Sequence, residues 1–216
     1  MNLWAESDCA RWLAAKPHGS VVYVSFGSFS HTNQDMIKMI ANGLVLSGLD
    51  FVWALRPECV SSEALPDGFW ESVGSRGLIV PWCKQKAVLS NSAVGGFLTH
   101  CGWNSIVESI WAGVPLICFP SVGDQITNRK MVVDDWGIGI DLFGAKSVAS
   151  CEEVAEKINA LMSGDSCDEL RRNIERVKKK LENAMTSNGS SRMNFDKFVE
   201  DLKAKMESCN SEFKPY

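Results

Sequence analysis

The sequence predicts an α/β fold built on a parallel sheet that is covered by helices on both faces. Short, nearly continuous apolar runs alternate along the chain with segments in which apolar residues recur at helical spacing. Continuous apolar strands are typical of parallel sheets, because such strands are buried on both faces. The chain has 216 residues, of which 45% are hydrophobic, which is enough for one sizeable core but few for two ordinary domains. We therefore expect residues 1–216 to form a single domain.

Six apolar runs are the expected strands, and they lie at 20–26, 51–55, 77–81, 95–99, 115–120 and 137–142. Helical patterns fall between most of them, at 33–48, 84–90, 104–112 and 124–135. The first of these has Ile37, Ile40 and Leu44 at helical spacing and stops at Gly48. Beyond residue 150 the pattern is helical only, at 150–164, 165–186 and 190–206, which predicts a helical tail.

The charge balance argues against nucleic acid and anionic membranes as partners. The net charge is −4, and both of those partners favour basic proteins. One basic run, between Arg171 and Lys180, is interleaved with Glu169, Glu175 and Glu182. A solvated helix face is therefore the favoured interpretation of that run.

The first residues and the cysteines indicate a cytoplasmic protein. Glu6 and Asp8 stand where a secretory signal needs an uninterrupted apolar core. No apolar run approaches the roughly 20 residues of a membrane span, so no spanning segment is expected. The eight cysteines form no CxxC pair and no Cys/His spacing typical of zinc. Reduced thiols are therefore expected rather than disulfides or a metal site.

Polar residues cluster where three of the expected strands end. Gly27 and Ser28 follow the first strand, residues 100–105 follow the fourth, and Asp124 and Gln125 come after the fifth. In parallel α/β sheets, ligands bind beyond the carboxyl ends of the strands. The first turn of a helix there offers free N–H groups and a partial positive charge, which suit phosphate. Together these residues predict a site for a diphosphate attached to a group rich in hydroxyls.

These residue types also have structural alternatives. Ser105 and Glu108 have the spacing of a capping box, and on spacing alone capping and ligand contact are equally favoured. Trp82 and Trp103 have the alternative of ordinary packing. A lone histidine at a strand end, such as His100, is more often structural than catalytic.

The sequence lacks the fingerprints of the common nucleotide sites. No GxGxxG follows the first strand, which weakens a nicotinamide or flavin interpretation, and no GxxxxGK[ST] loop is present. The sequence also has no cluster of acidic residues of the kind that holds a diphosphate through magnesium. Helix dipoles, His100 and short hydroxyl groups would then stabilise the diphosphate without a metal or another cofactor.

The segment 82–125 resembles the signature box of the plant secondary-product glycosyltransferases. The matching features are Trp82, Gln85, the run GGFLTHCGWNS, Glu108, the tripeptide GVP, and a closing Asp124 and Gln125. The run VVYVSFGS and the RP dipeptide at 56–57 are also family-like. The likeness extends over essentially the whole chain, which is similar to the plant family 1 UDP-glycosyltransferases and most like their 86A group.

The resemblance implies a role for each site residue. Trp82 would stack on uracil, the Cys83 main chain would bond the edge of that base, and Gln85 and Glu108 would hold the ribose. The residues expected to bind the two phosphates are Ser28, His100, Asn104 and Ser105, and those expected to contact the sugar are Trp103, Asp124 and Gln125. A Gln that closes the box further implies UDP-glucose as the donor. An Asp only accepts hydrogen bonds while a Gln also donates, so the pair would grip neighbouring hydroxyls of glucose.

The resemblance also implies a fold and a reaction. Such enzymes consist of two facing Rossmann-like domains, an arrangement called GT-B, and this chain corresponds to the C-terminal domain that binds the UDP-sugar. They invert the anomeric carbon without a metal. The implied activity is that of a UDP-dependent hexosyltransferase, which transfers glucose to a small hydroxylated plant metabolite.

In the family, the N-terminal half binds the acceptor and carries the catalytic His, and this sequence does not include a match to it. A general base must lie within hydrogen-bond reach of the acceptor hydroxyl. His18 and His31 do not match the family's base, so no catalytic residue is expected within residues 1–216. The chain is therefore expected to need an acceptor half, as a missing N-terminal domain or a partner chain. The alternatives are a non-catalytic module that binds UDP-sugar and a truncated fragment that is inactive alone.

Overall fold

The computed structural model describes residues 9–27, 34–56, 65–144, 150–163 and 167–212. Six parallel strands form one sheet in the order β3-β2-β1-β4-β5-β6. Their bounds are Val21–Ser25 (β1), Asp50–Ala54 (β2), Gly77–Val80 (β3), Val94–Thr99 (β4), Leu116–Cys118 (β5) and Gly139–Asp141 (β6). All six strands predicted from the apolar runs are present. The direction in which the sheet grows reverses between β1 and β4.

The sheet is buried on both faces, as its apolar runs predict. Every residue of β1 and β4 is buried. Tyr23 of β1 is paired in register with Phe97 of β4, and their rings stack with centroids 4.9 Å apart. On the neighbouring strand, Phe51 and Trp53 are fully buried. Burial of both faces requires a layer of helices on each side of the sheet.

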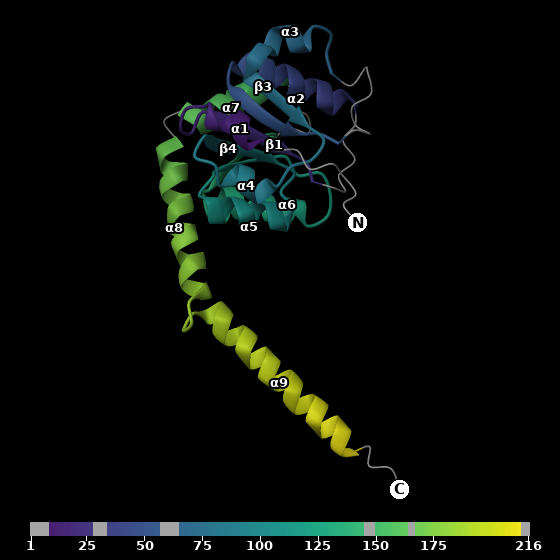
Figure 1. The fold of residues 1–216 in the computed structure, drawn as a ribbon, viewed down its shortest axis with the longest axis vertical. Coiled ribbons are helices and arrows are strands. Elements are labelled where there is room, and N and C mark those ends of the chain that lie inside the picture. The colour runs from purple at the N-terminus through teal and green to yellow at the C-terminus, as the bar shows by residue number, and fades with distance from the viewer. Residues whose placement is uncertain (1–8, 28–33, 57–64, 145–149, 164–166, 213–216) are drawn as a thin grey trace. The chain divides into compact units, whose positions relative to one another are not determined.

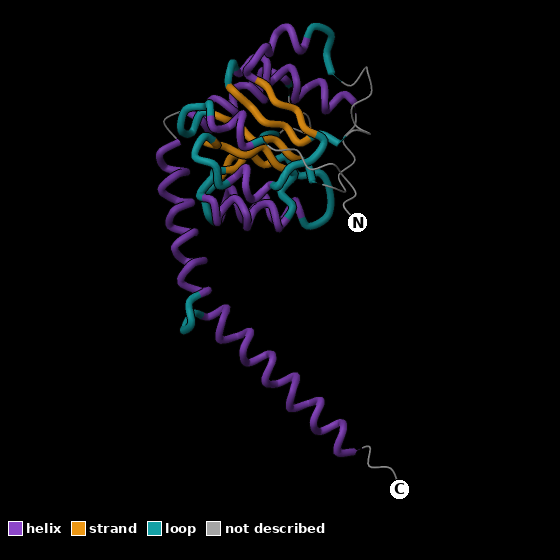
Figure 2. The backbone as a smooth tube through the Cα atoms, in the orientation of Figure 1, coloured by secondary structure: helices purple, strands orange, loops and turns teal. Residues whose placement is uncertain are grey.

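Helices supply those two layers (Figures 1 and 2). One face is covered by α2 (Gln34–Ser47) and α7 (Cys151–Ser163), and the other by α4 (Gln85–Leu89), α5 (Trp103–Ala112) and α6 (Gln125–Lys130). The helices α2 and α7 approach closely at Gly43, where a Cβ atom would lie 2.4 Å from Cγ1 of Val154. These five helices were predicted from the sequence, with bounds that differ by a few residues.

Other helical segments differ from the prediction. The helices α1 (Ala10–Ala14) and α3 (Phe69–Val73) and the 3₁₀ turn η2 (Gly74–Arg76) were not predicted, because such short segments show no period. The helix predicted over 124–135 changes at Met131 into a π-helical segment, η3 (Met131–Asp135). There the N–H of Trp136 bonds the carbonyl of Met131 at 2.9 Å, a spacing of five residues.

The chain divides into two compact units, Met1–Glu175 and Arg176–Tyr216. The first contains the sheet and its covering helices. The second contains the end of α8 (Cys167–Met185) and all of α9 (Ser190–Glu212). Gly189 lies between these two helices, where a Cβ atom would be 2.3 Å from the carbonyl oxygens of Asn183 and Ala184. The predicted helical tail is confirmed, with its break near Gly189.

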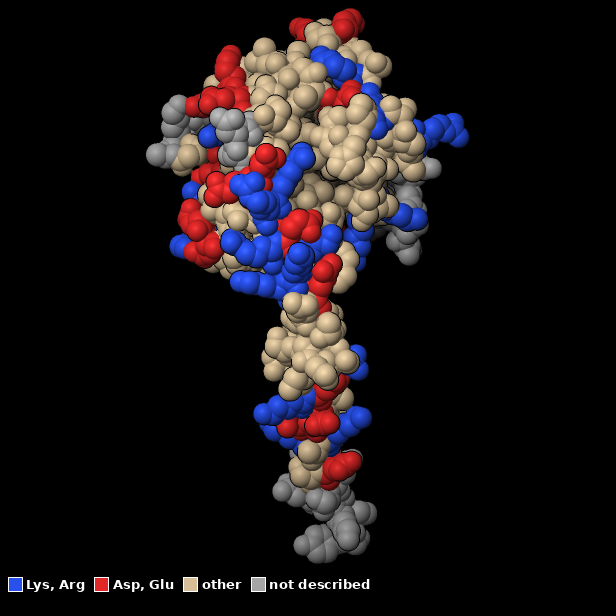
Figure 3. All heavy atoms as spheres, turned by 90° about the vertical axis from the view of Figure 1, so that its left-hand side faces the viewer, with Lys and Arg blue, Asp and Glu red and all other residues tan. Residues whose placement is uncertain are grey.

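Acidic and basic side chains are interspersed on the surface that carries α8 (Figure 3). This mixture fits the interpretation of the basic run in α8 as a solvated helix face. Among the helices that the structure describes, none combines the length and the apolar character needed to cross a membrane.

Candidate functional site

A cavity of about 870 Å³ opens at the carboxyl ends of β1, β2, β3 and β4. It lies where the strand order reverses, which is the usual ligand position in an open α/β sheet. The predicted site residues that line it are Trp82, Cys83, Gln85, His100, Trp103, Asn104, Ser105, Glu108 and Gln125. Asp124 precedes Gln125 and is exposed at the start of α6. Ser28, the remaining predicted residue, lies outside the described residues.

Two glycines hold the His100 imidazole between segments of main chain. A Cβ atom on Gly27 would lie 2.7 Å from Cε1 and Nε2 of His100, and one on Gly102 would lie 2.5 Å from Nε2. Gly27 also has φ of 73°, a conformation that suits glycine. These contacts explain why the sequence places a glycine after β1 and another two residues beyond His100.

The environment of His100 favours the neutral imidazole. Burial lowers its pKa below the usual value, while the nearby Ser25 main chain and the charge of Asp124 act in the opposite direction. Its Nδ1 atom is buried and has no hydrogen-bond partner among the described residues. A neutral histidine can still donate one N–H to an anion.

The start of α5 excludes capping as the role of Ser105. The helix begins at Trp103 with Gly102 as its N-cap, and no side chain caps it. Ser105 is therefore inside the first turn, and the capping-box interpretation is wrong. Its hydroxyl instead accepts a hydrogen bond from Nε2 of Gln85 at 3.1 Å.

Gln85 is the centre of a side-chain network that joins β1, α4 and α5, which we call the Gln85 network. Its Nε2 also donates to Oε2 of Glu108 at 2.9 Å, and its Oε1 accepts from the Tyr23 hydroxyl at 3.3 Å. Ser105 is the fourth member of this network. Sequence reasoning missed Tyr23, because it lies inside an apolar strand and has the pattern of a core residue.

An exposed indole and a buried thiol lie beside the Gln85 network. The side chain of Trp82 is 41% exposed, so a face of the ring is open to a ligand. Cys83 is buried, and its Sγ lies 3.4 Å from the Tyr23 hydroxyl. A hydrogen bond from Cys9 lowers the pKa of the Cys83 thiol to about 7, with burial opposing this and the Tyr23 hydroxyl supporting it.

A second network, which we call the α6 network, surrounds the start of α6. Oε1 of Gln125 accepts hydrogen bonds from the main-chain N–H groups of Ser121, at 2.8 Å, and Val122, at 3.1 Å. Because both partners are donors, the amide oxygen must face them, which leaves the Nε2 group with two hydrogens to donate. Asn128 completes the network by donating to Oδ2 of Asp124 at 2.8 Å and to the Cys101 carbonyl at 3.0 Å.

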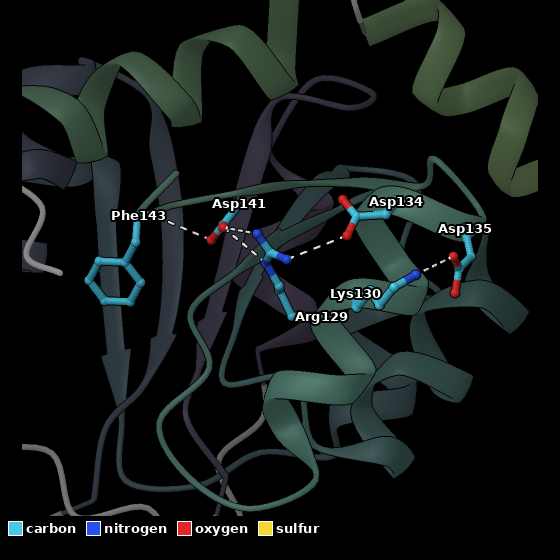
Figure 4. A network of polar contacts seen from close by, with 6 residues as sticks. All are labelled: Arg129, Lys130, Asp134, Asp135, Asp141 and Phe143. Carbon is cyan, nitrogen blue, oxygen red and sulfur yellow. Dashed lines mark hydrogen bonds and ion pairs between the residues drawn. The ribbon is translucent and has the colours of Figure 1, made fainter. Parts of the chain in front are cut away.

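Ion pairs fasten the outer side of α6 to the neighbouring segments (Figure 4). Arg129 donates from Nε to Oδ2 of Asp141 at 2.9 Å, and its NH1 lies 3.5 Å from Oδ2 of Asp134. The other oxygen of Asp141 accepts from the main-chain N–H of Phe143 at 3.2 Å. The end of β6 and the π-helical segment thereby brace the helix that carries Gln125 and Asn128.

The two remaining predicted residues in this part of the cavity are open to solvent. Trp103 is 47% exposed, and its ring centroid lies 6.4 Å from that of Trp136. Asn104 is exposed in the first turn of α5. Both side chains are therefore available to a ligand that fills the cavity.

The described cysteines, histidines and acids form no candidate metal site. Among the described residues, no group of three or more His, Cys, Asp or Glu side chains lies close enough to hold an ion. The six cysteines whose side chains are described are all free thiols.

The matching family is "UDP-glucoronosyl and UDP-glucosyl transferase", and the match covers residues 7–181. The chain is 51% identical to UDP-glycosyltransferase 86A1 of Arabidopsis thaliana, over 97% of this chain and 44% of that protein. It is 50% identical to UDP-glycosyltransferase 86A2 of the same plant, over 97% of this chain and 43% of that protein. The chain therefore spans less than half the length of these relatives.

Solved structures of similar proteins agree with the family match. Os79 from O. sativa, in complex with UDP, has a TM-score of 0.85 and 38% identity, over 93% of this chain and 44% of that one. UGT2 of Phytolacca americana, complexed with UDP-2fluoro-glucose and pterostilbene, has a TM-score of 0.80 and 35% identity, over 93% of this chain and 44% of that one. The sheet, its helices and this likeness confirm the predicted C-terminal GT-B fold. The chain belongs to the UDP-glucoronosyl and UDP-glucosyl transferase family.

Proposed function

We propose that this chain is the donor-binding part of a UDP-dependent glycosyltransferase that transfers glucose from UDP-glucose, with inversion, to a hydroxyl group of a small molecule. The observation that carries the proposal is the cavity at the β1–β4 reversal. It brings together an exposed Trp82, a His100 held between glycines, and the donor group of Gln125. The ligands of Os79 and UGT2, which are UDP and UDP-2fluoro-glucose, support the same ligand class here.

The nucleoside fits the part of the cavity around the Gln85 network. The open face of Trp82 offers stacking for uracil, and stacking of a base on an aromatic side chain is worth about 1–3 kcal/mol. Gln85 donates a hydrogen bond from Nε2 to Oε2 of Glu108 at 2.9 Å. Ribose hydroxyls could replace that bond by bonding Gln85 and Glu108 themselves, since a hydroxyl both donates and accepts.

The diphosphate fits the start of α5. This helix is ten residues long, and its first turn has unpaired N–H groups with no side-chain cap. His100 adds a neutral N–H donor from the end of β4. Together these groups would stabilise the charge that develops on UDP as it leaves, without a bound metal.

The sugar fits the α6 network, where Asp124 and Gln125 each keep a polar group with no hydrogen bond to a described residue. Oδ2 of Asp124 is bonded by Asn128, and Oε1 of Gln125 by the 121–122 main chain. This leaves Oδ1 of Asp124 to accept and Nε2 of Gln125 to donate. Glucose and galactose differ in the direction of one hydroxyl, and a buried polar group left without a partner costs about 1–3 kcal/mol.

The general base and the acceptor pocket belong to an acceptor half or a partner chain. The acceptor oxygen attacks the anomeric carbon on the face opposite UDP, its proton goes to that base, and the bond from carbon to the UDP oxygen breaks. None of the described residues is assigned as the base. A non-catalytic role, in which the chain only binds UDP-sugar, is the alternative.

Calorimetry and a transfer assay together test the proposal. We expect the affinity of the purified chain for UDP to be the same in magnesium and in a chelator, and likewise its affinity for UDP-glucose. We also expect UDP-glucose to bind more tightly than UDP-galactose. Transfer to a small phenol or alcohol should be negligible for the chain alone and restored when it is joined to the N-terminal half of a relative. Binding without restored transfer would favour the non-catalytic alternative, and no binding of either ligand would overturn the proposal.

A further inference from the structure

One buried polar side chain in the α6 network has no role in the predictions above. Asn128 is 5% exposed, and a buried amide must satisfy its hydrogen-bonding groups within the protein. Its Nδ2 group donates one hydrogen to the Cys101 carbonyl at 3.0 Å and the other to Oδ2 of Asp124 at 2.8 Å. Both partners are acceptors, so the nitrogen of the amide, and not its oxygen, must face them.

The first partner lies in the loop between β4 and α5. Cys101 is fully buried and has φ of 64°, which places a residue with a side chain in the left-handed region. This conformation is unfavourable for residues other than glycine and persists where the surroundings hold it. The residues on either side are His100 and Gly102, which carry the imidazole and its close main-chain contact. The bond from Asn128 therefore holds the loop that positions His100.

The second partner is the Asp124 carboxylate, which is otherwise exposed at the start of α6. A carboxylate on an exposed side chain rotates freely unless a hydrogen bond fixes one oxygen. Asn128 fixes Oδ2, while Oδ1 has no hydrogen bond to any residue that the structure describes. One oxygen is thereby anchored and the other left for a ligand.

We propose that Asn128 is a positioning residue for the donor: it orients Asp124 toward the sugar hydroxyls and fixes the distance between Asp124 and the His100 loop. The inference rests on the proposed function, since it assigns the sugar to Asp124 and the phosphates to His100. Because Asn128 bonds both Asp124 and the loop that carries His100, it couples recognition of the sugar to recognition of the diphosphate. Asn128 itself does not contact the reacting atoms.

The test measures how much the sugar adds to binding, as the ratio of the Kd for UDP to the Kd for UDP-glucose. We expect Asn128→Ala to lower this ratio by about tenfold, because the carboxylate loses the bond that orients it. Asn128→Leu keeps the number and branching of the side-chain heavy atoms and should give the same loss, so it serves if the alanine variant does not fold. Asn173→Ala is the matched control: it removes an Asn to main-chain bond of 2.9 Å, to Gly137, outside the cavity. It should leave the ratio unchanged.

A double-mutant cycle separates positioning from simple loss of stability. In the Asp124→Ala background, Asn128→Ala should lower the ratio no further, because the two residues act as one unit. An equal loss in both backgrounds, an unchanged ratio in Asn128→Ala and Asn128→Leu, or the same loss in Asn173→Ala would each overturn the inference while leaving the proposed function standing. Failure of the unsubstituted chain to bind UDP would overturn both.

Discussion

The Gln85 network and the α6 network lie at the same edge of the sheet but bond different partners. Gln85 bonds three other side chains, those of Tyr23, Ser105 and Glu108. In the α6 network, Gln125 bonds two main-chain N–H groups, and Asn128 bonds the main-chain carbonyl of Cys101. One network is therefore held by rotatable groups and the other by the backbone.

Because of this difference, the Gln85 network can change its hydrogen bonds when a ligand binds, while the α6 network is preorganised. Side chains can exchange their partners for ligand hydroxyls without moving the backbone, so the Gln85 network can adjust to a nucleoside. The free atoms of the α6 network have directions set by two loops and by the brace of Arg129 on Asp141. Discrimination between similar sugars requires groups with fixed directions. We therefore expect affinity to depend mainly on the first region and selectivity on the second.

Removal of the Trp82 indole should have the largest effect on affinity. Trp82→Ala should weaken binding of UDP and of UDP-glucose alike, by about 1–3 kcal/mol or roughly 5- to 150-fold, because it removes the stacking surface. Trp111→Ala is a suitable control, since that indole is also on the surface, at 52% exposure, but does not line the cavity. Calorimetry with both ligands measures the effect. Equal affinities for the Trp82 and Trp111 variants would remove Trp82 from the site.

Displacement of His100 should have the next largest effect and should fall on both ligands equally. The Cβ atom of Gly102→Ala would lie 2.5 Å from Nε2 of His100, so the imidazole must move. Overpacking of this kind costs about 1–3 kcal/mol, and we expect a loss of roughly tenfold in UDP affinity. The ratio of the two Kd values should stay near that of the unsubstituted chain.

A remote glycine provides the control for that variant. Gly48→Ala is strained by a φ of 71° but meets no atom within 4 Å. It should lower the melting temperature and leave UDP affinity unchanged. A Gly102 variant that binds UDP normally would show that the imidazole position does not matter for the phosphates.

The strands and the edge of the sheet at which the site lies could be predicted from the sequence, because apolar runs and strand ends are local features. Each strand was visible as a continuous apolar run, and the ends of neighbouring parallel strands must meet at one edge. The position of α5 was less predictable. The spacing of Ser105 and Glu108 fits a capping box, but the helix begins two residues before Ser105, after Gly102.

Tyr23 and Asn128 were missed because their roles depend on contacts far along the chain. Tyr23 is in an apolar strand, and the contacts of its hydroxyl with Cys83 and Gln85, 60 and 62 residues later, distinguish it from a core residue. Asn128 bonds Cys101, which precedes it by 27 residues. The left-handed conformation at Cys101 leaves no signal in the sequence, since the residue is not glycine.

A single substitution in the α6 network should weaken the binding of UDP-glucose more than the binding of UDP. Gln125→Glu can keep the two main-chain bonds through one oxygen, but its other oxygen cannot donate to a sugar hydroxyl. We expect the ratio of the Kd for UDP to the Kd for UDP-glucose to fall by roughly fivefold. Repulsion of the diphosphate by the new charge weakens the binding of both ligands, and that of UDP somewhat more, because its terminal phosphate carries an additional charge. This repulsion therefore acts against the expected fall of the ratio. An unchanged ratio would show that Gln125 does not read the sugar.

The smallest expected effect is a pH dependence of UDP binding that comes from His100. Burial lowers its pKa in the free protein, and a bound diphosphate would raise it, because a nearby negative charge favours the imidazolium form. UDP binding should therefore take up a fraction of a proton at a pH between those two pKa values, and His100 should take up none at a pH well above both. The affinity contribution of His100 grows accordingly as the pH falls. The terminal phosphate of UDP titrates near pH 6 as well, so His100→Gln, which keeps an N–H donor, supplies the reference. Calorimetry in buffers with different ionisation enthalpies counts the protons, and the same count for both proteins would show that His100 does not face the diphosphate.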